Sequence, residues 1–168
     1  MISTIDFHID ELTSMKKYPN ELFYIGNIEL LKKRKVSIIG TRRPTSYTKE
    51  FTYKLASKLS NAGICIISGA AMGVDALAHQ GANSNNTIAV VANGLDIRYP
   101  SVNKNLIIDI EKNGLILSAY KEKEKAKNYT FVLRNEIVVA LSEFLIVTQA
   151  DIDSGSLTSV NYALKMGK

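Results

Sequence analysis

Short runs of apolar, β-branched residues alternate with longer helical segments, and this alternation constrains the fold more than any other feature. The apolar runs occupy residues 36–39, 64–67, 87–91, 115–117 and 144–147. They lack in–out alternation, which is typical of strands buried on both faces of a parallel sheet. The segments that we expect to be helices are 46–61, 73–84, 102–113, 131–142 and 156–166. The pattern predicts an α/β fold, a doubly wound and mostly parallel sheet with helices on both faces.

The N-terminal part of the chain, residues 1–33, does not join this alternation. We expect it to form a lead-in segment, with the apolar residues 22–25 packed on an edge of the sheet. Residues 34–168 then form the α/β domain. Its last expected helix ends just before Gly167, where an open α/β sheet often adds another strand. We therefore expect this domain to be truncated at its C-terminus.

The basic residues are concentrated in one segment. The chain of 168 residues carries 21 Lys or Arg and 16 Asp or Glu residues, a net charge of +5 at pH 7. Residues 32–54 hold eight of the basic residues against Glu50 alone, so this segment carries +7 and the rest −2. Such a cluster is typical of a solvated face or of a site for an anionic partner. Lys32 to Lys35 precede the first strand and are expected to be solvated, whereas Arg42 and Arg43 follow it.

What the sequence lacks excludes other classes of protein. No apolar run reaches the ~18 residues of a membrane-spanning helix, so no contact with a membrane is expected. No Lys or Arg precedes Lys16, unlike in a secretory signal peptide. The single cysteine, Cys65, fits a reducing cytoplasm, and with two histidines in the chain no metal cluster is expected. We therefore expect a cytoplasmic protein without a bound metal.

The loop after the first apolar run has the chemistry of a phosphate site. Ligands of open α/β sheets bind beyond the carboxyl ends of the strands, so the residues that follow each run matter most. Here they are Gly40, Thr41, Arg42 and Arg43. The glycine allows a sharp turn, the next helix offers free N–H groups, and guanidinium groups donate forked hydrogen bonds to oxyanions. The dinucleotide and P-loop fingerprints are absent, and a glycine turn with surface arginines is the alternative.

Further loops are expected at the same edge of the sheet. The second run is followed by small residues that let a ligand approach the backbone or a helix pack closely, namely Ser68, Gly69 and Gly73. The loop after the fifth run, residues 150–156, offers hydroxyls and N–H groups that suit a phosphate. Its two carboxylates, Asp151 and Asp153, would repel a phosphate unless they turn away. The convergence of these loops indicates a common binding edge.

Groups suited to catalysis are scarce. His79 falls about one turn into an expected helix with no nucleophile beside it, so a packed or capping histidine is the simpler interpretation. Cys65 lies within an apolar run and is interpreted as a core residue. No catalytic residue, metal ligand or cofactor is therefore predicted.

Motifs in a fixed order carry a resemblance to a known family. They are GTRR (40–43), SGAAMGVDALAHQGA (68–82), TIAVVANGLDIRYPSVN (87–103), GLILSAY (114–120), FVLRNEIVVALS (131–142) and SGSLTSVNYAL (154–164). From about Tyr18 to its last residue the chain resembles the DprA/Smf family, bacterial DNA-processing proteins of natural transformation. Its GTRRPTSY segment is most similar to the epsilonproteobacterial form.

The resemblance implies an extended Rossmann-like fold that binds single-stranded DNA, protects incoming strands and assists the loading of the recombinase RecA. It also implies a homodimer without catalytic turnover, so an enzyme is not expected. By position, the residues that match the family's DNA-binding motifs are Gly40, Thr41, Arg42, Arg43, Ser68, Gly69, Gly73, Arg134, Asn135, Ser154, Gly155 and Ser156, with Lys104 as a further backbone contact.

Two positions depart from the family pattern. Many members have an arginine where this chain has Met72, and many have a second arginine where it has Glu136. On this comparison two positive charges are expected to be missing from the pocket, with Arg43 supplying one in compensation.

Two other functions stay open at this point. A Rossmann-like phosphoribohydrolase would split the N-glycosidic bond of a nucleotide, but its PGGxGTxxE loop is not found in this chain. Ser154, Gly155 and Ser156 stand in the comparable place with no glutamate following. A nucleotide-sensing or interaction module would bind a nucleotide without affinity for DNA.

Overall fold

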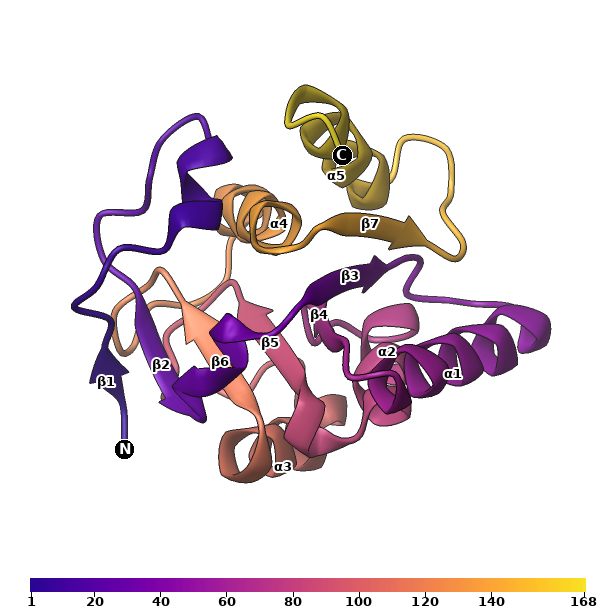
Figure 1. The fold of residues 1–168 in the computed structure, drawn as a ribbon, viewed down its shortest axis with the longest axis horizontal. Helices are drawn as coiled ribbons and strands as arrows, with labels where there is room; N and C mark the ends of the chain where they lie inside the picture. The colour runs from indigo at the N-terminus through magenta and orange to yellow at the C-terminus, as the bar shows by residue number, and fades with distance from the viewer.

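The computed structural model describes all 168 residues, which form a seven-stranded sheet flanked by α-helices (Figure 1). The strands are β1 (Ser3–Thr4), β2 (Phe23–Gly26), β3 (Lys35–Ile39), β4 (Cys65–Ser68), β5 (Thr87–Val91), β6 (Leu115–Ser118) and β7 (Phe144–Val147). The helices are α1 (Ser46–Asn61), α2 (Val74–Ala82), α3 (Lys104–Asn113), α4 (Asn128–Leu141) and α5 (Gly155–Lys165). Every strand and helix predicted from the alternation is present. None of the helices combines the length and the apolar character needed to cross a membrane.

The strand order places a reversal of direction beside β3. The order is β1-β2-β6-β5-β4-β3-β7, and β3 to β7 pair in parallel. The chain builds the sheet from β3 outward to β6 and then returns to the other side of β3 to add β7. The carboxyl ends of β3 and β7 therefore flank the topological switch point, where α/β sheets bind ligands. The outer edge of β7 has no strand beside it.

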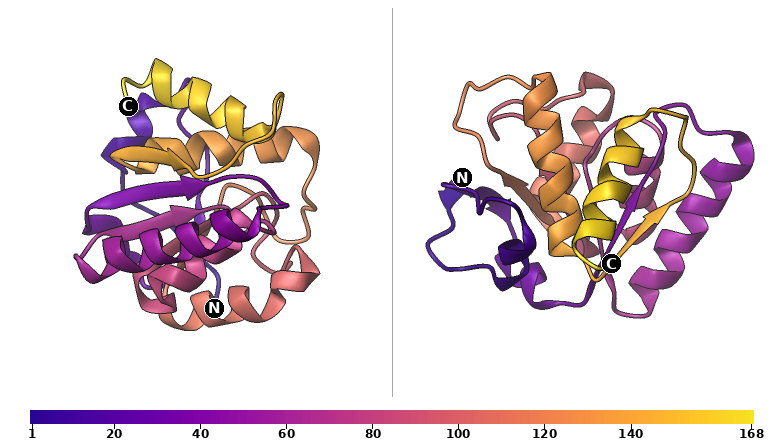
Figure 2. Two further views of the ribbon diagram at one scale, coloured as in Figure 1. Left: turned by 90° about the vertical axis from the view of Figure 1, so that its right-hand side faces the viewer. Right: turned by 90° about the horizontal axis from the view of Figure 1, so that it is seen from above.

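Helices cover both faces of the sheet, as predicted. α1 and α2 pack on one face around Ile38 and Ile66, and α3 packs beside them against Ile116. α4 packs on the opposite face against Ile67 and Val90, and α5 lies next to α4 (Figure 2). Every residue of β3 to β6 is buried, which explains why these runs are mostly apolar and do not alternate with polar residues. The structure confirms the predicted Rossmann-like α/β fold.

The N-terminal segment extends the sheet at its other edge. β2 pairs with β6 in antiparallel orientation, so residues 23–25 of the predicted edge contact at 22–25 lie in a strand of the sheet. Leu12 and Leu22 of this segment are buried in the same cluster as the apolar face of α4. The carboxylate of Glu136 on α4 accepts a hydrogen bond of 2.8 Å from the backbone N–H of Lys16. The segment is thus packed against the core of the α/β domain.

The helix α4 starts earlier than expected, at Asn128 rather than at residue 131. Thr130 explains the difference, because its hydroxyl accepts a hydrogen bond of 2.8 Å from the backbone N–H of Lys127 and so caps the first turn. The earlier start places Phe131 in the first turn of the helix and Arg134 in the second.

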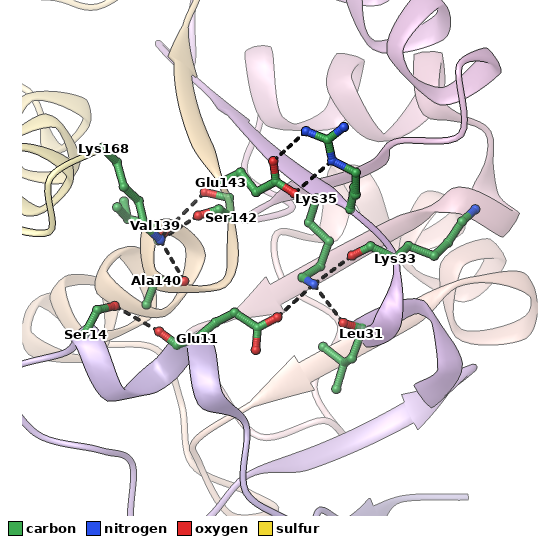
Figure 3. A network of polar contacts seen from close by, with 11 residues as sticks. Glu11, Ser14, Leu31, Lys33, Lys35, Val139, Ala140, Ser142, Glu143 and Lys168 are labelled. Carbon is green, nitrogen blue, oxygen red and sulfur yellow. Dashed lines mark hydrogen bonds and ion pairs between the residues drawn. The ribbon is translucent and has the colours of Figure 1, made fainter.

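The first residue of β3, Lys35, is buried, contrary to the expectation that Lys32 to Lys35 are all solvated. The ammonium group of Lys35 donates hydrogen bonds to the carbonyls of Leu31 (2.7 Å) and Lys33 (2.8 Å) and to the Glu11 carboxylate (3.1 Å) (Figure 3). These partners compensate for the loss of water around a buried charge. Nearby, the Lys168 ammonium group donates to carbonyls at the end of α4, those of Val139, Ala140 and Ser142.

Candidate functional site

A cleft of about 410 Å³ lies at the topological switch point. Its walls come from the loop after β3, the loop between β7 and α5, and the second turn of α4. It unites most of the residues predicted to bind DNA, namely Gly40, Thr41, Arg42, Arg43, Gly69, Arg134, Asn135, Ser154, Gly155 and Ser156. These residues are distant in sequence and meet because β7 returns to pair with β3.

The arginines of the cleft fall into two kinds. Arg42 and Arg43 are exposed, and neither guanidinium group has a hydrogen-bonding or ionic partner in the protein. Arg134 is buried, with Nη1 donating to the carbonyls of Gly69 (2.6 Å) and Val90 (3.2 Å). The ring of Phe131 lies near one arginine of each kind, its centroid 5.7 Å from Cζ of Arg42 and 5.3 Å from Cζ of Arg134. Arg134 therefore fixes the loop after β4, whereas Arg42 and Arg43 are free to bind an anion.

A buried carboxylate supports the same loop. Asp75 accepts hydrogen bonds at Oδ2 from the backbone N–H groups of Gly69 (3.1 Å) and Ala71 (3.3 Å). Burial raises the pKa of Asp75, while the nearby Arg134 guanidinium acts in the opposite direction. This carboxylate orients the loop and leaves the free positive charge of the cleft to Arg42 and Arg43.

The start of α5 offers unused donors to the cleft. The first N–H groups of an α-helix have no partner within the helix, and Gly155 and Ser156 are the first residues of α5. Ser154 precedes them, and its hydroxyl oxygen is buried without any hydrogen-bond partner. A buried hydroxyl without a partner is costly, so a ligand oxygen at this point would satisfy it.

A second carboxylate opposes an anion in the cleft. Asp151 lines the cleft, and its Oδ2 accepts a hydrogen bond of 3.4 Å from the Thr41 hydroxyl. The same hydroxyl accepts a hydrogen bond from the backbone N–H of Arg43 at 3.2 Å. Asp153, by contrast, does not line the cleft. Of the two carboxylates expected to repel a phosphate, only Asp151 is placed to do so.

Comparison with known proteins decides which family the chain belongs to. The model of the family named DNA recombination-mediator protein A matches residues 6–168. The chain belongs to this family. The DNA processing protein DprA of Streptococcus pneumoniae is 37% identical over 160 residues, which cover 94% of this chain and 56% of that protein. The protein of the same name from Bacillus subtilis is 36% identical over 160 residues, covering 94% and 54%.

A solved structure of DNA processing protein A from Helicobacter pylori, which describes that protein's single-stranded DNA binding mode, has a TM-score of 0.97. It is 40% identical and covers 99% of this chain, while the match spans 78% of that chain. The predicted resemblance to the DprA/Smf family is thus confirmed. The chain spans about half the length of the curated DprA relatives that it matches.

Three of the residues predicted to bind DNA lie outside the cleft. The Ser68 hydroxyl is buried and donates to the Ile38 carbonyl at 2.6 Å, which ties β4 to β3. Gly73 precedes α2 at φ +82°, a conformation that favours glycine, and a Cβ there would lie 2.5 Å from the Thr41 carbonyl. Lys104 is exposed at the start of α3 and does not line the cleft.

The two departures from the DprA/Smf pattern lie in different places. Met72 is 42% exposed and lines a small neighbouring pocket together with Tyr99 and Phe131. This pocket shares Arg42 and Arg134 with the cleft, so its residues form the rim of the cleft. Glu136 does not line the cleft, because its carboxylate binds the backbone of the N-terminal segment on another side of α4. The expectation that two positive charges are missing from the pocket is therefore wrong for Glu136.

The two groups that sequence analysis considered for catalysis are both buried. His79 accepts a hydrogen bond at Nε2 from the backbone N–H of Ala70 (3.3 Å), and its Nδ1 lies 2.6 Å from the Thr87 hydroxyl. Burial lowers the pKa of His79 to about 3. Burial raises the pKa of the Cys65 thiol to about 12. The interpretation of both as core residues is confirmed.

One lining residue escaped the sequence analysis. Ser159 is buried on α5 and lines the cleft together with Ser156. The two serines are three positions apart, and residues at that spacing share a face of a helix. Helical spacing counted onward from the Ser-Gly-Ser motif could therefore have identified Ser159.

Proposed function

We propose that this chain binds single-stranded DNA through the phosphates of its backbone, in the cleft between β3 and β7. The observation that carries the proposal is the set of unused donors in this cleft. The guanidinium groups of Arg42 and Arg43 have no hydrogen-bonding or ionic partner in the protein, and the Ser154 hydroxyl is buried without one. The first N–H groups of α5 point at the same space, and helix N-termini of this kind bind phosphates.

The chemistry of the cleft favours contacts to the backbone over contacts to base edges. Guanidinium, hydroxyl and N–H donors satisfy phosphate oxygens in any sequence, and aromatic residues at a rim let bases stack without regard to sequence. Phe131 and Tyr99 lie at the rim beside Met72. The solved H. pylori relative, for which single-stranded DNA binding is described, supports this choice of ligand.

The family supports further parts of the proposal. We assign DNA binding to residues 34–168, with residues 1–33 as a lead-in that packs on the sheet. Within natural transformation, the bound state protects incoming strands and assists the loading of RecA, and the chain acts as a homodimer in the cytoplasm. Binding proceeds without turnover, which agrees with the burial of His79 and Cys65. The predicted contacts at Ser68, Gly73 and Lys104 stay part of the proposal as support for the loops or as peripheral phosphate contacts.

The test is a fluorescence anisotropy titration of labelled oligo-dT across salt concentrations. With about three phosphates neutralised, log affinity should fall against log salt with a slope of about −2. The double variant Arg42→Ala, Arg43→Ala should bind more than about tenfold more weakly, because two phosphate contacts are lost. The control is Lys16→Ala, Lys17→Ala, which removes the same charge from exposed residues of the N-terminal segment.

Other outcomes would contradict the proposal. Affinity that is insensitive to salt, or equal loss of binding in both double variants, would mean that the cleft is not the site. Release of free base from AMP would favour a phosphoribohydrolase. A rise in melting temperature with nucleotide, together with no affinity for DNA, would favour a nucleotide-sensing module.

A further inference from the structure

The basic residues of the segment 32–54 divide into two groups according to their partners. Five of the eight are held by protein groups, in the pairs Lys32–Glu29, Lys33–Asn86, Arg34–Glu143, Lys35–Glu11 and Lys54–Glu50. The remaining three are exposed and make no ion pair or side-chain hydrogen bond, namely Arg42, Arg43 and Lys49. The free positive charge of the segment is therefore confined to these three residues.

These three residues surround a second hollow, outside the cleft. The hollow has a volume of about 560 Å³ and lies where the loop after β3 meets α1 and α2, so we call it the outer groove. Besides the free cations it is lined by Pro44, Gly73, Ala76, Leu77 and Gln80. Arg42 and Arg43 line both the cleft and the outer groove, so they form a ridge between the two.

The two hollows differ in their balance of charge. The cleft contains the carboxylates of Asp75 and Asp151 beside its arginines. No carboxylate lines the outer groove, where Lys49 adds a third cation to the two arginines of the ridge. A surface with free cations and no acid attracts a polyanion and releases the counterions condensed on it.

The shape of the outer groove suits the continuation of a chain molecule rather than an isolated ion. Ala76 and Leu77 give it an apolar wall, and Gln80 adds an exposed amide. A sugar–phosphate backbone presents apolar sugar faces and charged phosphates in alternation, which such a surface accommodates. A strand that is bound in the cleft and crosses the ridge would enter the outer groove while its phosphates stay in contact with Arg42 and Arg43.

We infer that the single strand held in the cleft crosses the ridge of Arg42 and Arg43 and continues along the outer groove, where Lys49 binds a phosphate. This inference rests on the proposed function of the cleft. On this inference a short oligonucleotide occupies the cleft only, whereas a longer one also reaches the outer groove. Lys49 therefore contributes to the affinity for long strands only.

The test compares Lys49→Ala with Lys58→Ala on two lengths of oligo-dT. Both lysines are exposed on α1 without an ionic partner, but Lys58 lines neither hollow, so it is the matched control. For an oligo-dT of about 20 nucleotides, Lys49→Ala should lower the affinity about fivefold and make the salt slope shallower by about 0.7, the loss of one phosphate contact. For an oligo-dT of about four nucleotides, which matches the lower end of known site sizes, neither variant should change the affinity.

The outcomes separate the inference from the proposed function. Equal affinity of Lys49→Ala and wild type for the long strand overturns the inference while leaving the cleft as the binding site. An equal loss of affinity of Lys49→Ala for short and long strands also overturns the inference, because Lys49 would then contact the segment bound in the cleft. Absence of binding by the wild type to either length would instead refute the proposed function.

Discussion

At the scale of single residues, the cleft contains two kinds of charged side chain: some are held by hydrogen bonds within the protein, and others have no such partners. Arg134 and Asp75 are buried and bind the backbone of the loop after β4, so they shape the site. Arg42 and Arg43 are exposed and unpaired, so they carry its charge. The sequence predicts all three arginines as phosphate ligands, because residue type alone does not show that Nη1 of Arg134 donates hydrogen bonds to two backbone carbonyls.

Gly155 permits a direct test of backbone contact by the ligand. A Cβ at this position would meet only Asn135 Nδ2, at 3.9 Å, so the protein itself has room for Gly155→Ala. We expect the free energy of unfolding to stay the same or to rise by up to about 1 kcal/mol. The added methyl group would intrude on a phosphate at the start of α5 and cost about 1 kcal/mol of binding, about fivefold in affinity. Urea denaturation and anisotropy measure the two effects, and unchanged affinity would contradict a phosphate contact here.

Asp151 gives a prediction of the opposite sign. Its carboxylate faces the space assigned to phosphate, and Asp151→Asn removes that charge while keeping an acceptor for the Thr41 hydroxyl. We expect tighter binding of oligo-dT by about 1 kcal/mol, about fivefold, the size of one charge–charge repulsion at contact in water. Asp153→Asn is the matched control, since Asp153 is exposed and outside the cleft. Weaker binding by the Asp151 variant would place the strand elsewhere.

At the scale of elements, the apolar runs predicted the strands because burial on both faces leaves an unbroken apolar sequence. The order of the strands was not predictable in the same way, since alternation along the chain does not state which side of β3 receives β7. The start of α4 at Asn128 was missed because the first turn of the helix is set by the Thr130 hydroxyl, which binds the backbone of Lys127. The apolar pattern, from which the helix was predicted, begins only at residue 131. The contact of residues 22–25 with the edge of the sheet was predicted from their apolar character alone, and the strand that forms it covers residues 23–26.

The amino end of β3 offers a test of how the N-terminal segment is held. Lys35 connects β3 to Glu11 and to the carbonyls of Leu31 and Lys33. Lys35→Met should lower the free energy of unfolding by about 2 kcal/mol, because buried carbonyls lose a charged donor. Lys32→Met removes only an exposed pair with Glu29 and should change stability by less than about 0.5 kcal/mol. Urea denaturation of both variants distinguishes them, and equal effects would show that the burial of Lys35 contributes nothing.

At the scale of the whole molecule, the excess of positive charge lies in one segment of the chain. The segment 32–54 carries +7 in a chain of net charge +5, yet only Arg42, Arg43 and Lys49 remain without partners. Composition could predict the segment but not which of its basic residues stay free. Glu29 and Glu50 lie within four residues of their partners Lys32 and Lys54, whereas Glu11 and Glu143 come from distant parts of the chain. Glu143 pairs with Arg34 only because β7 returns beside β3.

Global stability should fall in mild acid because of His79. The folded state holds the pKa of this histidine at about 3, whereas the unfolded chain takes up a proton below about 6.5. The unfolded state therefore binds more protons between these values, and the free energy of unfolding falls as the pH decreases through this window. Below about pH 6 the loss should approach 1.4 kcal/mol per pH unit. Urea denaturation at several pH values should show a shallower dependence for His79→Gln, and parallel curves would contradict the assignment.

The unpaired outer edge of β7 bears on the behaviour of the chain in solution. Phe144 to Val147 form a wholly apolar edge strand without charge or proline, and the absence of these protective features favours association with another strand edge. Excluded salts such as sulfate strengthen apolar association, whereas all salts weaken phosphate binding. A salt titration therefore changes two equilibria in opposite directions, favouring self-association as DNA is released. Titrations of dilute protein with chloride salts therefore measure DNA release without added self-association.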